Sequence, residues 1–534
     1  MSGLPLTIAV AQINPIVGDI EGNFEKLLFA HAQGSALGAQ LVVAPELSVL
    51  GYPPEDLIHM PAFRQRAMAA VNELATKTKD GAAFIVGCVW EEGGNAYNAA
   101  VLLDGGKIAQ VQYKSALPNY GVFDEKRIFV AGNGPKAVTC RGVKLGILVC
   151  EDVWVEANAQ SLKDQGAQLL VAINASPFEA GKLALRKRSV ARAGLPLVYV
   201  NAVGGQDDIV FDGGSFFMQE DGSVIAHLPE FSEQISLLAP NTYTPFSQQE
   251  TLWQAMSVGL RDYVRKNGFS SVLLGISGGI DSALTAALAV DALGAKRVRG
   301  VLLPSPYTSP ESNEDALALA ANLGIEAQSI CITPMMETYK AALDPAFARW
   351  STAESQWMED PSTGGNLQAR IRGQVLMALS NKTGAMLLTT GNKSEIAVGY
   401  STLYGDSCGG YNVLKDLYKT QVFALATWRN TKGAAIPERS ITKPPSAELK
   451  PGQKDEDQLP PYAVLDAILQ HHLEGQLEAR QIINKGFDAA VVSKVLRLVR
   501  INEYKRRQSA PGVKLSPMLF GRDRRYPLTN RSDA

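Results

Sequence analysis

Two long stretches of the sequence alternate short apolar runs with helix-like segments. In the first stretch the apolar runs are nearly continuous, which is typical of strands with both faces covered. These runs are 6–13, 41–44, 84–90, 99–103, 108–113, 143–150, 168–174 and 197–203. Glycine-containing turns separate three of them, which predicts antiparallel hairpins between 84 and 113. A helix-like segment covers 21–37. The first stretch therefore predicts a layered α/β domain over residues 1–240.

The second stretch alternates strand and helix more strictly. Its expected strands are 272–276, 298–303, 325–332 and 386–389, and its expected helices are 281–293, 311–323 and 366–380. This order predicts a doubly wound, mostly parallel sheet over residues 251–534. Prolines and small polar residues interrupt the pattern between the two stretches and predict a linker at 241–250. A further segment rich in proline, 437–462, is typical of a functional lid loop.

Charge and composition exclude several classes of protein. The 51 basic and 53 acidic residues nearly cancel, which argues against a nucleic-acid coat or a polybasic membrane anchor. No apolar run reaches the roughly 18 residues of a membrane span. The five cysteines form no close pairs, which favours a reducing, cytoplasmic location over a disulfide framework. We therefore expect neither nucleic acid nor a membrane as a partner.

Three chemically able residues follow expected strands of the first stretch. Glu46 comes after 41–45, Lys114 ends the strand at 108–113, and Cys150 ends that at 143–150. A free cysteine is more often a core residue, and a lone Glu or Lys is more often a solvated charge. Together they supply the base and the cation that a thiol needs to act as a nucleophile. Cys88 lies in mid-strand and fits the core, whereas Cys408 in a glycine-rich loop is a rival nucleophile.

The segments around these residues resemble a known family. VVAPELSVLGYPPED, YKSALPNYGVFDEKRIF and GILVCEDVW are similar to the three signature blocks of the nitrilase, or carbon–nitrogen hydrolase, superfamily, in the same order. The resemblance implies an αββα sandwich and a Glu46–Lys114–Cys150 triad that hydrolyses amides through a thioester. It also implies that Glu125 orients the site. Similarity to the glutaminase branch implies a further set of residues that bind glutamine: Tyr120, Ser176 and Lys182.

The string Ser-Gly-Gly-Ile-Asp-Ser at 277–282 joins an expected strand to an expected helix. Its glycines allow backbone N–H groups to approach an anion closely, and a helix N-terminus favours negative charge. Asp281 could hold a magnesium ion against phosphate oxygens. A glycine-rich turn with a capping aspartate is the alternative interpretation. The GK[ST] ending of a Walker A loop is missing.

Further segments resemble one class of enzyme. The string at 277–282 after VLLGI resembles the pyrophosphate-binding loop of N-type ATP pyrophosphatases, and GNLQARIRG, LLTTGNKSEIAVGYSTLYGD, LKDLYKTQV and KPPSAELKPGQKDEDQLPPY are similar to NAD synthetases. The resemblance implies ATP binding by Ser277, Gly278, Gly279, Asp281, Ser282, Thr390 and Lys419. It implies Mg²⁺ at Asp281 and Glu395. It implies deamido-NAD binding by Asn366, Arg370 and Asp406. A solvated helix face remains the alternative for Arg370 and Arg372.

The two halves together resemble the family of glutamine-dependent NAD synthetases. The resemblance implies that ammonia released from glutamine amidates deamido-NAD that ATP has activated as an adenylate, giving NAD, AMP, pyrophosphate and glutamate. It also implies a homo-oligomer. One alternative is an amide synthetase for another carboxylate. Another is a silent nitrilase-like scaffold on an ammonia-dependent synthetase. The basic tail at 505–507 and 522–525 is either a solvated terminus or an arm near substrate phosphates.

Overall fold

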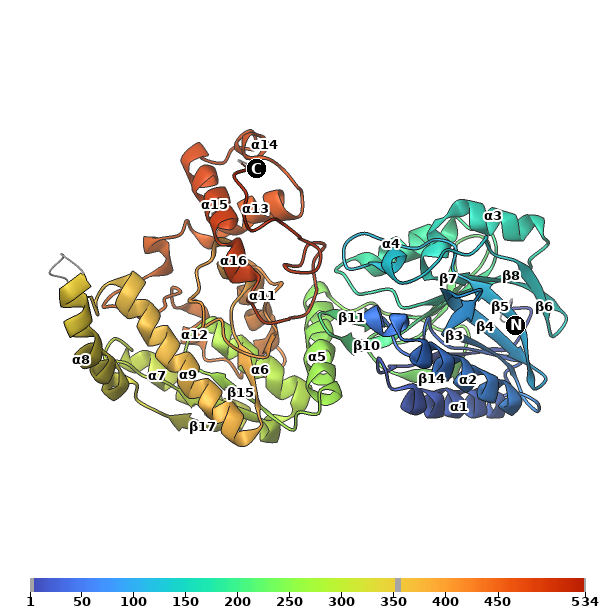
Figure 1. Ribbon diagram of the computed structural model, residues 1–534, viewed down its shortest axis with the longest axis horizontal. Coiled ribbons are helices and arrows are strands. Elements are labelled where there is room, and N and C mark those ends of the chain that lie inside the picture. The colour runs from blue at the N-terminus through green and yellow to red at the C-terminus, as the bar shows by residue number, and fades with distance from the viewer. Residues whose placement is uncertain (1–3, 351–356, 533–534) are drawn as a thin grey trace. The chain divides into compact units, whose positions relative to one another are not determined.

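The computed structural model describes residues 4–350 and 357–532. The chain divides between Ser247 and Gln248 into two compact units (Figure 1). Helix α5 (Gln248–Lys266) opens the second unit, so the last three positions of the predicted linker are helical. Among the described residues, no helix combines the length and the apolar character that crossing a membrane would require.

The first unit contains two six-stranded sheets. The order of the first is β14-β1-β2-β3-β4-β5, and that of the second is β13-β12-β9-β8-β7-β6. The first comprises β1 (Ile8–Gln12), β2 (Leu41–Val43), β3 (Ala83–Glu92), β4 (Asn95–Asp104), β5 (Lys107–Tyr113) and β14 (Gln234–Leu237). The second comprises β6 (Ala137–Cys140), β7 (Val143–Val149), β8 (Leu169–Asn174), β9 (Leu197–Asn201), β12 (Phe216–Met218) and β13 (Val224–His227). The antiparallel pairing of β3, β4 and β5 confirms the predicted hairpins.

Four longer helices and several short elements complete this unit. The helices are α1 (Ile20–Ala36), α2 (Pro61–Lys77), α3 (Glu156–Asp164) and α4 (Lys182–Ala191). The short elements are the hairpin strands β10 (Val203–Gln206) and β11 (Ile209–Asp212) and the helical turns η1 (Glu55–His59), η2 (Glu125–Arg127) and η3 (Cys150–Trp154). The predicted strand at 197–203 is therefore wrong at its end. Backbone pairing stops at Asn201, and Val203 begins the separate hairpin.

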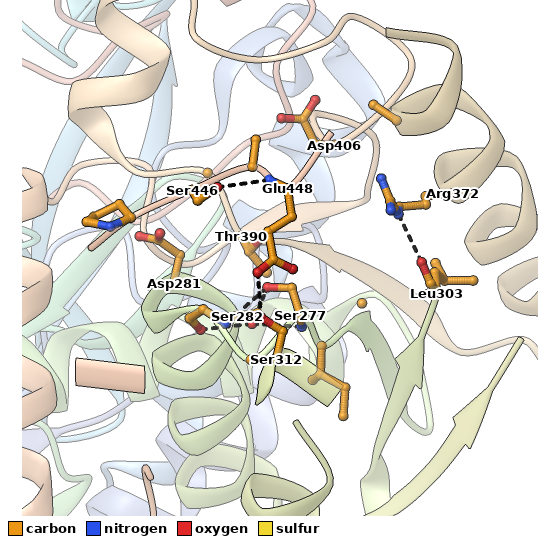
Figure 2. Close-up of a pocket in the computed structure, with 18 of the residues that line it drawn as sticks. Ser277, Asp281, Ser282, Leu303, Ser312, Arg372, Thr390, Asp406, Ser446 and Glu448 are labelled. Carbon is orange, nitrogen blue, oxygen red and sulfur yellow. Dashed lines mark hydrogen bonds between the residues drawn. The ribbon is translucent and has the colours of Figure 1, made fainter. Parts of the chain in front are cut away.

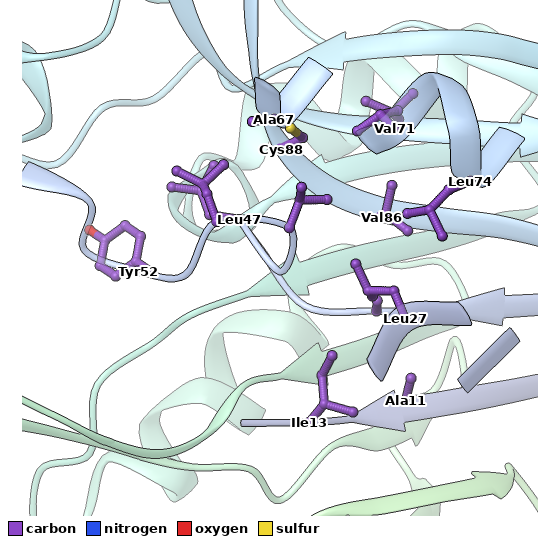
Figure 3. Close-up of a cluster of buried hydrophobic side chains, with 14 of the residues drawn as sticks. Ala11, Ile13, Leu27, Leu47, Tyr52, Ala67, Val71, Leu74, Val86 and Cys88 are labelled. Atoms are coloured by element: carbon purple, nitrogen blue, oxygen red, sulfur yellow. The ribbon is translucent and has the colours of Figure 1, made fainter. Parts of the chain in front are cut away.

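Successive residues of a strand point to opposite faces of its sheet, and this alternation builds the layers. In β1, Ile8 and Val10 face a core shared with the second sheet, whereas Ala9 and Ala11 face a core shared with α1 and α2. Figure 3 shows this helix-side core, with Leu27, Val71, Leu74 and Val86 around Cys88. A third core joins the second sheet to α3 and α4. The arrangement is the predicted αββα sandwich, and Cys88 is a core residue in it.

The second unit is built on a five-stranded sheet in the order β17-β16-β15-β18-β19, with all pairs parallel. The strands are β15 (Val272–Gly275), β16 (Val298–Leu302), β17 (Glu326–Ser329), β18 (Met386–Thr389) and β19 (Tyr411–Asn412). The chain builds outward from β15 to β17 and then returns to the other side of β15. This reversal is a topological switch point, where ligands of such sheets bind at the carboxyl ends of the strands. The predicted doubly wound fold is confirmed.

Helices flank this sheet and form a separate bundle in the last part of the chain. Those connected to the sheet are α6 (Ile280–Leu293), α7 (Pro310–Leu323), α8 (Thr333–Trp350), α9 (Asn366–Thr383), α10 (Lys393–Val398) and α11 (Lys419–Asn430), with turns η4 (Ala295–Arg297) and η5 (Pro361–Gly365). The later ones are α12 (Glu438–Thr442), α13 (Tyr462–Leu473), α14 (Ala479–Ile483), α15 (Ala489–Ile501) and α16 (Glu503–Arg506), with turn η6 (Asp455–Asp457). The predicted lid, 437–462, thus contains α12 and η6.

The basic tail has an internal role. Arg506 and Arg524 are both buried, and each donates to the Glu503 carboxylate, at 2.8 Å and 2.6 Å. Lys505 donates to the carbonyl oxygens of Gly399 and Ser401, both at 2.7 Å. For these three cations neither a solvated terminus nor an arm toward phosphates is correct, because protein acceptors already hold them.

Candidate active sites

Cys150 lies directly after β7, at the start of η3. Its φ is +48°, in the left-handed region that a side chain with a Cβ rarely adopts. Such a conformation costs on the order of 1–3 kcal/mol and persists only where the surroundings impose it. Asp152 imposes it here. One of its oxygens accepts from Val149 N at 3.2 Å, and the other accepts from Ser115 N at 2.9 Å. The turn that presents the thiol is thus fastened to the segment that follows Lys114.

Lys114 is fully buried between two carboxylates. Its Nζ lies 2.7 Å from Glu46 Oε1 and 2.7 Å from Glu125 Oε1. Asn98 Nδ2 also donates to Glu46 Oε1, at 2.8 Å, and Ala175 N donates to Glu46 Oε2, at 2.8 Å. These contacts fix both oxygens of the Glu46 carboxylate. The structure therefore brings together three of the four residues of the predicted catalytic set by direct hydrogen bonds, and strand β7 delivers Cys150 to the same group.

The charges in this group act on one another. Burial raises the pKa of the Cys150 thiol, and the nearby Glu46 carboxylate raises it further, while Lys114 opposes both. The resting thiol is therefore protonated and requires a base. Burial disfavours the Lys114 ammonium, but Glu125 and Glu46 more than offset this and hold its pKa well above the ordinary value. Burial raises the pKa of Glu125 to about 7, against the effect of Lys114.

The residues predicted to bind glutamine lie at different depths. Ser176 is buried, and its hydroxyl accepts from Arg186 Nε at 3.1 Å. Tyr120 is exposed, and its hydroxyl lies 3.0 Å from both carboxylate oxygens of Glu151. Lys182 Nζ lies 5.8 Å from the centre of the Phe123 ring and acts electrostatically on Glu151. Glu151 was not predicted, although its position next to Cys150 was a signal that could have identified it.

The second unit has a cavity of about 320 Å³ at the switch point of its sheet. Figure 2 shows five of the residues that line it, Ser277, Asp281, Ser282, Thr390 and Asp406. The loop at 277–282 follows β15 and opens α6, as the sequence predicts. Because β15 and β18 are parallel neighbours, Thr390, which follows β18, lies beside this loop. All seven residues of the predicted ATP set line the cavity: Ser277, Gly278, Gly279, Asp281, Ser282, Thr390 and Lys419.

The loop needs glycine at 278. Gly278 has φ +74°, and a Cβ there would lie 2.3 Å from the carbonyl oxygen of Ser312. The Ser282 hydroxyl accepts from Ser277 N at 3.1 Å and donates to the carbonyl oxygen of Gly279 at 3.0 Å. The loop is thus closed on itself at the N-terminus of α6. Backbone N–H groups at a helix N-terminus favour binding of phosphate.

Two carboxylates share one lysine in this cavity. Lys419 Nζ donates to Asp281 Oδ2 and, at 3.1 Å, to Glu395 Oε1, and Asn392 Nδ2 donates to Asp281 Oδ1 at 3.0 Å. Burial raises the pKa of Glu395 to about 7, and Asp281 adds to this against the effect of Lys419. One ammonium therefore does not fully compensate the negative charge that the two carboxylates would carry together.

The three residues predicted to bind deamido-NAD are not equally placed. Asp406 lines the cavity, and its Oδ1 accepts from Thr402 N at 2.6 Å. Asn366 is connected to it through the same residue, because Thr402 Oγ1 donates to Asn366 Oδ1 at 2.7 Å. Arg370 is exposed and donates to the carbonyl oxygen of Leu403 at 3.2 Å. Neither Asn366 nor Arg370 belongs to the residues that line the cavity. Arg372 does, so the solvated-face interpretation is wrong for it.

The predicted lid covers part of this cavity. Residues 443–449 line it, together with Ser440 and Asp455. The Glu448 carboxylate accepts from Ser312 Oγ and Lys443 Nζ, both at 2.8 Å, and from Ser309 Oγ at 2.9 Å. Gln368 Nε2 donates to the carbonyl oxygen of Leu449 at 3.0 Å. These bonds connect the lid to α7 and α9. Cys408 also lines the cavity, and burial raises the pKa of its thiol to about 11. It belongs to the second unit and not to the group of Glu46, Lys114 and Cys150 in the first.

Comparison with known proteins decides the family. The carbon–nitrogen hydrolase model matches residues 7–240, and the NAD synthase model matches residues 252–509. A glutamine-dependent NAD(+) synthetase of Rhodobacter capsulatus is 46% identical, with 98% of each chain covered. One of Synechocystis sp. is 45% identical, with the same coverage. The chain belongs to the glutamine-dependent NAD(+) synthetases.

A solved structure agrees with this assignment. The glutamine-dependent NAD(+) synthetase from Acinetobacter baumannii, determined with ADP, is 41% identical, covers 98% of each chain and superposes with a TM-score of 0.78. The family predicted from the motifs is therefore confirmed, and with it the class of enzyme. Neither another carboxylate acceptor nor a silent scaffold is favoured by these relatives.

Proposed function

We propose that the first unit releases ammonia from glutamine at Cys150, and that the second unit uses ATP and this ammonia to convert deamido-NAD to NAD. The observation that carries the proposal is the fully buried Lys114, held by Glu46 and Glu125 beside the Cys150 turn. Burying a lysine between two carboxylates costs desolvation energy, and titratable groups perturbed in this way cluster at functional sites. Ammonia is mostly protonated at neutral pH, so its release within the same chain limits its loss as unreactive ammonium.

The hydrolysis of glutamine proceeds in two halves. Glu46 takes the thiol proton while the Cys150 sulfur attacks the amide carbon, and Lys114 donates a hydrogen bond to the developing oxyanion. The C–N bond then breaks, and the proton on Glu46 passes to the leaving ammonia, which leaves a thioester. In the second half Glu46 takes a proton from water, whose oxygen attacks the thioester carbon. The C–S bond breaks, glutamate leaves, and the proton returns to the sulfur.

Glutamine is a zwitterion beyond its reacting amide, so its binding requires both a cation and an anion. Lys182 provides the cation for the α-carboxylate, and Glu151, which Tyr120 orients, provides the anion for the α-ammonium. The electrostatic effect of Lys182 on the pKa of Glu151 supports this pairing. Ser176 provides a buried hydroxyl next to Ala175, whose N–H donates to Glu46. Lysine offers a point charge rather than a bidentate fork, so Tyr120 and Ser176 would supply much of the orientation.

The Glu125 carboxylate makes hydrolysis dependent on pH. Its pKa lies at about 7, so the carboxylate that stabilises the Lys114 ammonium is protonated as the pH falls below this value. We expect kcat/KM for glutamine to decrease by about tenfold per pH unit below 7. The side chain in Glu125→Gln is neutral at every pH. This variant should therefore have a lower kcat/KM above pH 7 and a weaker dependence on pH below 7. Glutamate release, measured at pH 5.5–8.5, tests this. If kcat/KM in Glu125→Gln falls below pH 7 with the same midpoint as in wild type, another group causes the pH dependence.

ATP would lie with its phosphates on the 277–282 loop and with Thr390 and Lys419 beside them. The carboxylate oxygen of deamido-NAD attacks the α-phosphorus, pyrophosphate leaves, and ammonia then displaces AMP from the adenylate carbon. No covalent bond to the protein is needed, so placement and charge neutralisation carry this half of the reaction. Asp406 on the cavity wall, with Asn366 held behind it by Thr402, would orient deamido-NAD. Arg370 would contact the exposed part of this substrate.

Asp281 and Glu395 fit a magnesium ion. Magnesium is usually held by one or two carboxylates together with substrate phosphates rather than by a cage of protein ligands. The described residues contain no cluster of three or more acidic, histidine or cysteine side chains that would form such a cage. The raised pKa of Glu395 indicates negative charge that a cation beside Lys419 would stabilise. When bound, magnesium supplies positive charge to the phosphate oxygens.

Closure of the lid would exclude water from the adenylate. The bonds of Glu448 and of the Leu449 carbonyl hold residues 443–449 over the cavity, and water that reached the activated carboxylate would hydrolyse it. The five unpaired cysteines fit a reducing cytoplasm. A homo-oligomer remains a prediction.

Product analysis tests the proposed function as a whole. The protein is incubated with ATP, Mg²⁺ and ammonium, and NAD, AMP and pyrophosphate are measured with deamido-NAD or with other carboxylates as acceptor. We expect equal amounts of the three products with deamido-NAD alone. Pyrophosphate release with a different carboxylate and none with deamido-NAD would contradict the assignment. Glutamine then replaces ammonium, and glutamate is measured against NAD.

A further inference from the structure

Arg186 is fully buried in α4, although the sequence of that helix, KLALRKRSVA, is rich in cations and its Arg188 is exposed. Its Nη1 donates to both carboxylate oxygens of Asp212, at 2.8 Å and 2.7 Å. Asp212 is equally buried at the end of β11. A buried pair of this kind adds little net stability compared with apolar residues of similar size, so its presence suggests another purpose.

The rest of the Arg186 guanidinium holds one short segment, residues 175–177. Nε donates to Ser176 Oγ at 3.1 Å, and Nη2 donates to the carbonyl oxygens of Ser176 and Pro177, at 2.8 Å and 2.9 Å. Asn201 completes the support, because its Oδ1 accepts from Ser176 N at 2.9 Å and its Nδ2 donates to Asp212 Oδ1 at 3.2 Å. Both the side chain and the backbone of Ser176 are thereby fixed.

Residues 175–177 also contact Glu46, the general base of the Cys150 site. Ala175 N donates to Glu46 Oε2 at 2.8 Å, while Lys114 and Asn98 hold the other oxygen. A shift of residues 175–177 would therefore displace the Ser176 hydroxyl and turn the Glu46 carboxylate together. A displacement of about 1 Å at a reacting group can reduce a rate by about 100-fold.

We propose that Arg186 and Asp212 are positioning residues of the glutamine site, which fix residues 175–177 so that Ser176 meets glutamine and Ala175 orients Glu46. The proposal rests on the function proposed above for Ser176 and Glu46. Arg186 does not touch the reacting atoms. It acts through the segment that it holds, and Asp212 fixes the orientation of its guanidinium.

Arg186→Lys tests the fork directly, because it keeps the positive charge but replaces five donors in a plane by a single ammonium. Asp212→Asn is a second, nearly isosteric variant that removes the carboxylate facing the guanidinium. For both variants we expect kcat/KM for glutamine to fall by about 100-fold, with a clear rise in KM. Loss of folded enzyme would instead lower kcat and leave KM unchanged. Separate values of kcat and KM therefore distinguish a positioning role from a loss of stability.

Two controls come from the same protein. NAD formation driven by ammonium should remain at the wild-type level in both variants, because it does not use the glutamine site. Arg188→Lys changes an exposed arginine of the same helix and should leave the KM for glutamine unchanged. An unchanged KM in both Arg186→Lys and Asp212→Asn would overturn the proposal.

A double-mutant cycle with Ser176→Ala separates the two proposals. If Arg186 acts through Ser176, Arg186→Lys should raise the KM for glutamine much less in the Ser176→Ala background than in wild type. Fully additive effects would show that Arg186 acts elsewhere and would overturn the positioning role. If Ser176→Ala alone leaves KM unchanged, the proposed contact between Ser176 and glutamine is wrong, and the positioning proposal falls with it. That outcome differs from one in which only the Arg186 and Asp212 variants have no effect.

Discussion

Cys150→Ala should abolish NAD formation from glutamine while retaining NAD formation from added ammonium. Removal of the sulfur removes the atom to which the acyl group is attached, and the loss of such a nucleophile lowers the rate by on the order of 10⁴-fold or more. Cys150 does not line the cavity of the second unit, so the adenylate should still form there. NAD and glutamate are measured in the same reaction, with glutamine and with ammonium chloride in turn.

A matched cysteine variant controls this result. Cys331 is exposed, and its hydrogen bond to Thr333 lowers its pKa, so it is the thiol that a reagent in solution meets readily. Cys331→Ala should leave both nitrogen sources effective. NAD formation from glutamine that survives in Cys150→Ala would show that another group is the nucleophile. Glutamate release that is absent even in the wild type would instead revive the silent scaffold.

The grouping of Glu46, Lys114 and Cys150 could be predicted because each of them follows a strand. Glu46, Lys114 and Cys150 come after β2, β5 and β7, and a change of hydrophobic pattern marks each strand end. The bonds that orient them could not be predicted, because partners lie 52 residues apart for Asn98 and 129 for Ala175. No local pattern determines which of two stacked sheets supplies a donor.

Buried cations were the least predictable part of the structure. In a sequence, a lysine or arginine in a polar helix is expected on a solvated face, yet Arg186, Lys393 and Arg506 are buried and paired. Their burial depends on acids brought close by the fold. Arg186 carries a weak local signal, since Val190 is buried one helical turn later on the same face.

Helices near the end of the chain were missed for a different reason. The strongest of these patterns is in α15, where Val492, Val495, Leu496 and Val499 are buried at spacings of three and four residues. This is the signature of an amphipathic helix, and it was available in the sequence. The motifs of the second half are concentrated around its cavity, whereas α13 and α15 form a separate core with α10.

Asp281→Asn should stop NAD formation from either nitrogen source. Asp281 accepts from both Lys419 and Asn392, so an amide in its place must direct donor hydrogens toward one of two donors. The change also removes a charge that a magnesium ion on the phosphates would require. Loss of one preorganised electrostatic contact of this kind costs about 10²–10³-fold in kcat. NAD and pyrophosphate are measured with ammonium as nitrogen source, over a range of Mg²⁺ concentrations.

Another aspartate of the same helix provides the comparison. Asp291 in α6 pairs with Arg429 at 2.7 Å and does not line the cavity. Asp291→Asn should therefore keep its activity and lose at most about 1 kcal/mol of stability, as is usual for a partly exposed ion pair. Full ammonium-driven activity of Asp281→Asn at an unchanged Mg²⁺ requirement would exclude Asp281 from magnesium binding. Activity that returns only at higher Mg²⁺ would support it, because a weakened site is filled by mass action.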